Sequence, residues 1–103
     1  MKLSRAKLRK LIEDATVDAY NDSEQRVGFL TMIEENLDLP FMTCILGAEV
    51  RVERIDIISA DEIVAVGRRG RTRQTIPILE LPLPTPAPKG AEWIEAYRRW
   101  LRR

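Results

Sequence analysis

The sequence predicts an α+β domain in which helices flank a small, strongly bent antiparallel sheet. Three observations predict it: apolar residues at helical spacing near both ends of the chain, short β-branched runs in the middle, and a proline tract before the last helical segment. The chain has 103 residues, of which 45% are hydrophobic, and this is the size of one small domain with a modest core.

Residues 1–15 are expected to form a basic, amphipathic N-terminal helix. Leu8, Leu11 and Ile12 recur at helical spacing between basic residues. Ser4 is a suitable N-cap, because its side-chain oxygen can accept a hydrogen bond from a free N–H of the first turn.

A second helix is expected to begin at Asp22 or Ser23, either of which can serve as its N-cap. Pro40 is expected to end this helix, because the residue before a proline is pushed toward extended geometry. Its predicted core face is Phe29, Leu30, Ile33 and Leu37.

The middle of the chain predicts sheet. "FMTCIL" (41–46) is expected to be a short buried run, and "EVRVERIDI" (49–57) alternates with a change of phase that indicates a bulge near Glu53. Residues 62–79 predict a hairpin around the glycine-containing "GRRGR". Pro77 places the end of its second strand at an edge of the sheet.

Residues 81–89 have a proline at nearly every second position, which predicts an extended connector. A last helix is expected to begin near Gly90. In that helix Trp93, Tyr97 and Trp100 recur at i, i+4 and i+7, a spacing that favours packing in the core.

Together these elements predict an SH3-like, partly open barrel of four or five strands, with N-terminal helices and a C-terminal helix. Residues 16–103, including the proline-rich connector, are expected to form a single domain behind the N-terminal helix.

Composition excludes several classes of protein. The sequence contains no histidine, which removes the usual general base and the commonest zinc ligand, so we expect a protein that is not an enzyme. Its one cysteine, Cys44, lies in an apolar run and is expected to be a buried thiol. Neither a secretory signal nor an apolar run long enough to span a membrane is recognisable, and we expect a cytoplasmic protein.

Charge is segregated along the chain: residues 1–10 carry a net +5, residues 11–66 a net −10 and residues 67–103 a net +6. Such polarity predicts either two faces with different partners or ends that fold back on the acidic middle.

Three carboxylates, Glu34, Glu35 and Asp38, fall in the expected last turn of the second helix. Acidic side chains there oppose the partial negative charge of the helix C-terminus, at a cost of roughly 0.3–1 kcal/mol each when exposed. Glu34 and Asp38 are expected to lie together at i and i+4, where a cation would cancel both the dipole cost and their repulsion. A solvated helix end with an arginine nearby is the structural alternative.

A second acidic cluster contains Asp18, Asp22 and Glu24. It fails the EF-hand template, because the sixth position counted from Asp18 is Ser23 and the twelfth is Phe29. Asp22 and Glu24 are also well explained as cap and first-turn charges of the second helix. Asp18, Asp22 and Glu35 are therefore supporting candidates for metal ligands, behind Glu34 and Asp38.

The opposite charge favours a different function. Four arginines surround the glycine turn of the hairpin: Arg68, Arg69, Arg71 and Arg73. Such an arrangement can bind phosphates or an acidic protein. The alternative function is thus an SH3-like interaction module that binds a protein or nucleic-acid partner through residues 68–73, with cation binding by the carboxylates lost. The proline tract could also occupy a groove in such a module.

The stretch "VDAYNDSEQRVGFLTMIEENLDLPFMTCIL" (17–46) resembles the cyanobacterial calcium-binding protein family of the CcbP type. "EVRVERI", the hairpin and "EWIEAYRRW" are similar to that family too, so the resemblance covers about residues 16–101. It implies a small barrel with flanking helices in a bacterial calcium-binding protein, a buffer or sensor that holds Ca²⁺ through carboxylates without EF-hands.

The sequence departs from the family pattern in its basic residues. The hairpin reads "GRRGRTRQ", and Ala96 stands in the last helix where the family has an acid, which leaves Glu92 and Glu95. This departure disfavours a calcium site that uses the hairpin or the last helix.

Overall fold

The computed structural model describes residues 2–103. In that part of the chain it contains three α-helices, one four-stranded antiparallel sheet and two short 3-10 turns, Ser59–Asp61 and Ile78–Glu80. The helices are α1 (Arg5–Thr16), α2 (Asp22–Asn36) and α3 (Glu92–Leu101). The strands are β1 (Phe41–Ile45), β2 (Ala48–Ile58), β3 (Glu62–Arg69) and β4 (Thr72–Pro77).

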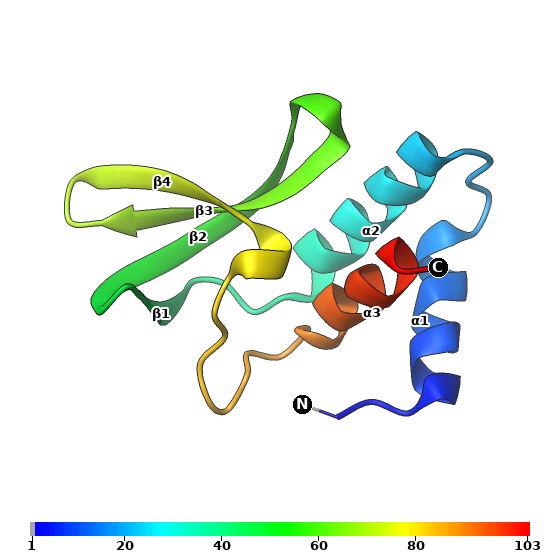
Figure 1. Cartoon of the computed structure of the whole chain (residues 1–103), viewed down its shortest axis with the longest axis horizontal. Helices are drawn as coiled ribbons and strands as arrows, with labels where there is room; N and C mark the ends of the chain where they lie inside the picture. The colour runs from blue at the N-terminus through cyan, green and yellow to red at the C-terminus, as the bar shows by residue number, and fades with distance from the viewer. Residues whose placement is uncertain (1) are drawn as a thin grey trace.

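The strands follow one another in the order β1-β2-β3-β4, so the sheet is an antiparallel meander that remains open between β1 and β4. Figure 1 shows the sheet at the left of the molecule and the three helices at the right, with the β3–β4 turn at the end of the sheet remote from the helices. The predicted α+β fold with a partly open sheet is confirmed.

The helix starts follow local hydrogen bonding. Ser4 caps α1 as predicted, with its hydroxyl oxygen accepting from the Lys7 N–H at 3.1 Å. The predicted cap of α2 is wrong by one or two residues: Asn21 is the N-cap, and its side-chain oxygen accepts from the Glu24 N–H at 2.8 Å. Asp22 is instead the first helical residue, where its negative charge still favours the helix dipole.

The predicted strand over residues 49–57 is confirmed as β2, and the predicted hairpin over residues 62–79 is confirmed as β3 and β4. The register of β2 against β3 shifts between Val52 and Arg54, which places the bulge at Glu53. Only two residues connect β3 to β4, and Gly70 adopts the positive φ of 59° that such a tight turn requires at its first position. Pro77 ends β4, an edge strand.

The prediction of a buried run at residues 41–46 is wrong. β1 is an edge strand in which only Thr43 is buried, and Cys44 is exposed. The helices cover one face of the sheet, so alternate residues of this apolar run face solvent. Thr43 points inward, and its hydroxyl donates to the Pro82 carbonyl.

The core lies between the three helices and one face of the sheet. The predicted aromatic residues of α3 are all buried in it, and Phe29 of α2 lies 5.4 Å, centroid to centroid, from both Tyr97 and Trp100. α1 contributes Leu11 and Ala15 to the same cluster. Of the predicted core face of α2, Leu30 is only partly buried, while the other members are buried.

The connector between Leu81 and Gly90 has no helix or strand, as predicted. Among the helices of the described chain, none is both long and apolar enough to cross a bilayer.

Candidate functional site

The C-terminal end of α2 differs from the prediction in one decisive respect. α2 ends at Asn36: the Leu37 N–H still donates to the Ile33 carbonyl at 2.9 Å, but Leu37 itself is extended, with φ −75° and ψ 124°. Glu34 and Glu35 therefore lie in the last turn as predicted, whereas Asp38 lies outside the helix. The expected i, i+4 pairing of Glu34 with Asp38 is wrong.

A segment remote in the sequence closes this helix end. The Asp38 N–H donates to the Lys89 carbonyl at 2.8 Å, and Gly90, with φ +94°, lies directly against the Asn36 carbonyl. A Cβ on Gly90 would lie 2.1 Å from that carbonyl oxygen, so no other residue fits there without a shift of the backbone. The backbone of Asp38 is thus held by the end of the proline-rich connector.

The carboxylates at this end are exposed and uncompensated. Within residues 2–103, none of Glu34, Glu35 and Asp38 forms a salt bridge, and the last turn of α2 contains no basic residue. Of the structural alternative, a solvated helix end with an arginine nearby, the solvated part agrees with the exposure of these side chains, while no arginine of the described chain forms an ion pair with them. Their negative charge adds to that of the free helix carbonyls.

Asp18 and Asp22 lie at the other end of α2. Asp22 and Glu34 are separated by about 18 Å along the helix, at 1.5 Å per residue, so the two groups of carboxylates cannot share one ion. Asp18 is exposed in the α1–α2 loop with φ +60°. Asp22 accepts from the Arg103 guanidinium at 2.6 Å, an ion pair that gives it a structural role.

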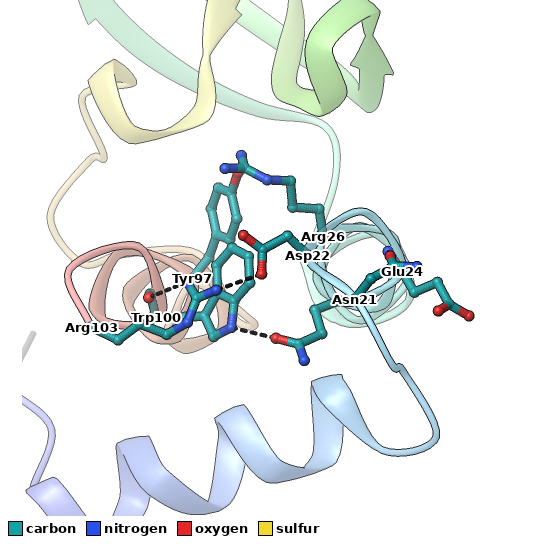
Figure 2. A network of polar contacts seen from close by, with 8 residues as sticks. Asn21, Asp22, Glu24, Arg26, Tyr97, Trp100 and Arg103 are labelled. Carbon is teal, nitrogen blue, oxygen red and sulfur yellow. Dashed lines mark hydrogen bonds and ion pairs between the residues drawn. The ribbon is translucent and has the colours of Figure 1, made fainter.

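That ion pair belongs to a polar network between α2 and α3, shown in Figure 2. The Arg103 guanidinium lies 4.0 Å from the centroid of the Trp100 ring, and the Trp100 Nε1–H donates to Gln25 Oε1 at 2.8 Å. Arg26 Nη1 donates to the Tyr97 hydroxyl at 3.1 Å.

The sequence alone did not predict this network between α2 and α3. The i, i+3 spacing of Trp100 and Arg103 was the available signal for their stacking.

The carboxylates do not form a complete metal cage as they stand. Among residues 2–103, no three or more Asp, Glu, Cys or His side chains lie close enough together to hold a metal ion. Calcium takes about six to eight oxygens, so the side chains at the end of α2 fit only part of a calcium shell in this arrangement.

The arginines of the hairpin lie at the far end of the sheet. Arg69, Arg71 and Arg73 are exposed, and Arg68 is half-buried with its Nε 3.4 Å from Glu53 Oε1. The register places Arg68 directly opposite Arg73, so these two like charges lie side by side.

Comparison with known proteins gives one finding. A family model described as calcium binding, of the CcbP type, matches residues 9–101, nearly the whole chain. No curated protein and no solved structure matches the chain.

Proposed function

The chain belongs to the calcium-binding family of the CcbP type, and from that premise we propose that it is a cytoplasmic calcium buffer or sensor that works without EF-hands and without catalysis. The observation that carries this proposal is the family match over residues 9–101. The uncompensated acidic end of α2 supports it, because that arrangement costs stability in the absence of a cation.

We assign the principal calcium ligands to Glu34 and Asp38, with Glu35 beside them. Glu34 and Glu35 project from the last helical turn. The Asp38 side chain projects from a stretch of backbone that Lys89 and Gly90 hold in place. The side chains would have to close around the ion, and water or backbone carbonyls would supply the remaining oxygens. Asp18 and Asp22 would belong to a separate ion, for which Arg103 competes.

The test is isothermal titration of calcium into chelator-stripped protein at physiological salt, with magnesium as the second titrant. We expect micromolar, calcium-selective binding in the wild type and its loss in the variant Glu34→Gln with Asp38→Asn. The same variant should melt at a slightly higher temperature than the wild type without metal, because removal of Glu34 relieves a dipole conflict of about 0.3–1 kcal/mol.

The matched control is Glu13→Gln with Asp14→Asn on α1, which removes the same charge from two exposed positions. This control should bind calcium as the wild type does. A wild type that shows no heat and no calcium-dependent rise in melting temperature up to millimolar calcium would contradict the proposal.

A second candidate function is favoured by the exposed hairpin. Arg69, Arg71 and Arg73 form no salt bridge within the described chain, and they gather at the end of the sheet remote from the helices (Figure 1). We propose that residues 68–73 bind an acidic partner, protein or nucleic acid. Titration of the protein with polyglutamate and with a nucleic acid tests this, and the absence of binding to both would contradict it.

A further inference from the structure

A row of arginines crosses the sheet from strand to strand. The register places Arg51 of β2 directly opposite Arg68 of β3, and Arg68 directly opposite Arg73 of β4. Residues that pair directly across an antiparallel ladder project from the same face, and neighbouring strands lie about 4.8 Å apart, so the row is about 10 Å long. Arg51 is remote from the hairpin in the sequence, and only the register brings it there.

This row lies on the face of the sheet that points away from the core. Val52 and Gly67, the neighbours of Arg51 and Arg68 along the chain, pair with each other on the opposite face, where Val52 is fully buried. Beyond the bulge, Arg54 pairs with Val66, which lies on the same outer face as Arg68. The outer face therefore carries four arginines, Arg51, Arg54, Arg68 and Arg73, and the same alternation places two carboxylates on it, Glu49 and Asp56, neither of which forms a salt bridge with an arginine of this face in the described chain.

The turn adds two more basic side chains, Arg69 and Arg71, both exposed. We call these six residues the arginine face. Glu53 is the only carboxylate in the described chain that forms a salt bridge with a member of this face, and it reaches only Arg68.

This arrangement is unfavourable for an empty sheet. Like charges directly opposite each other on a sheet are destabilising, and the row contains two such pairs in succession. A ligand that carries several negative charges at similar spacing would reverse the sign of that interaction. The geometry thus favours a polyanion over a single small anion.

The chemistry of the face favours phosphate. All six basic residues are arginines, whose planar guanidinium matches phosphate with paired hydrogen bonds. A protein partner would need apolar or aromatic anchors, and the row ends in only one exposed apolar side chain, Met42 of β1, opposite Arg51. Residues 48–77 contain no aromatic side chain on which an unpaired base could stack, which favours a duplex over a single strand.

We infer that the arginine face binds the phosphate backbone of double-stranded nucleic acid without sequence preference, through Arg51, Arg68 and Arg73 as its central row. This inference rests on the second proposed function, the binding of an acidic partner by residues 68–73, and adds to it the partner class and the participation of β2.

Fluorescence anisotropy with two labelled DNA duplexes of unrelated sequence tests the inference, at salt concentrations from about 50 to about 200 mM. Both duplexes should bind equally, with an affinity that falls linearly in the logarithm of the salt concentration at about −0.9 per phosphate contacted. Arg51→Gln should weaken binding to both duplexes about five-fold and reduce the salt slope by about one.

The matched control is Arg102→Gln, which removes the same charge from an exposed position just after α3. It should leave the affinity and the salt slope unchanged, and circular dichroism should show that both variants are folded. Equal losses in Arg51→Gln and Arg102→Gln would overturn the inference, because they would report net charge alone.

Polyglutamate separates this inference from the proposal on which it rests. Binding of polyglutamate without binding of duplex would overturn the inference and leave the hairpin function standing, whereas binding of neither would overturn both. Duplex binding that is lost in Arg71→Gln but unchanged in Arg51→Gln would confine the partner to the turn and overturn the role of β2.

Discussion

Tyr97 shows how one side chain joins α3 to α2. It is 3% exposed, its ring packs on Phe29, and its hydroxyl accepts a hydrogen bond from Arg26. Burial raises the pKa of the Tyr97 phenol above its ordinary value, and the carboxylates of Glu62 and Asp61 raise it further, while the nearby Arg26 guanidinium acts in the opposite direction. The folded protein therefore disfavours the phenolate.

The raised pKa of Tyr97 predicts how the free energy of unfolding depends on pH. The unfolded chain releases the Tyr97 proton near the ordinary tyrosine pKa of about 10, and the folded chain holds it to higher pH. The free energy of unfolding should consequently fall as pH rises above about 10, and Tyr97→Phe should lose less of its stability over that range than the wild type. Urea denaturation at pH 7 and at several pH values above 10 measures the difference.

Tyr20→Phe is the control for this prediction, because Tyr20 is 86% exposed in the α1–α2 loop. It should follow the wild-type profile. A Tyr97→Phe profile that falls as steeply as the wild type would contradict the role assigned to Tyr97.

At the scale of the element, α2 is stabilised differently at its two ends. Its N-terminus has Asn21 as cap, with Asp22 and Glu24 in the first turn, and the Tyr20 N–H donates to Glu24 Oε1 at 3.2 Å. These contacts satisfy free N–H groups and favour the dipole. Its C-terminus has carboxylates where the dipole favours cations, and that end is closed by the Asn36 side chain, which donates to the Met32 carbonyl at 2.8 Å, together with the tertiary contacts of Lys89 and Gly90.

The N-cap makes a quantitative prediction. Asn21→Ala should lower the free energy of unfolding by about 1 kcal/mol, because the Glu24 N–H loses its acceptor. Ser23→Ala should change it by only a few tenths of a kcal/mol, because Ser23 lies inside the helix and caps nothing. Chemical denaturation measures both, and an equal effect of the two substitutions would argue against Asn21 as the cap.

At the scale of the whole molecule, the approach of α1 to α2 depends on Gly28. A Cβ at this position would lie 2.0 Å from the Ala15 carbonyl oxygen, a backbone atom that cannot turn aside. Both helices contribute to the single core, with Leu11 and Ala15 from α1 and Phe29 and Ile33 from α2. A side chain at position 28 would therefore move one helix relative to the other.

Gly28→Ala should destabilise the protein by about 2–3 kcal/mol, although alanine is the better helix former. Val27→Ala is the control, since Val27 is an exposed neighbour on the same helix, and it should be close to neutral. Thermal denaturation compares them. A Gly28→Ala protein as stable as the wild type would mean that the two helices can separate at no cost.

The charge segregation of the sequence is partly resolved within the molecule. Arg68 pairs with Glu53 and Arg103 with Asp22, so two bases of the C-terminal part fold back on the acidic middle, as one of the two predicted outcomes required. The remaining hairpin arginines and the acidic end of α2 form no ion pairs within residues 2–103. These are the two surfaces to which functions are assigned.

Features that depend only on neighbouring residues could be predicted from the amino-acid sequence. The period of apolar side chains predicted the aromatic face of α3, the phase change at Glu53 predicted the bulge, and glycine between two β-branched runs predicted the hairpin. Each of these patterns acts over a few residues, because helix and strand periods and turn geometry are local properties of the backbone.

Contacts between distant segments, in contrast, determine which faces are covered and which remote residues meet. Cys44 is exposed because the helices cover only the other face of the sheet. Asp38 lies outside α2 because Lys89 and Gly90 contact the backbone at the end of that helix. Arg51 joins the hairpin arginines only through the pairing of β2 with β3. A local pattern shows which side chains share a face, but the contacts that bury a face or end a helix come from segments far along the chain, which that pattern does not specify.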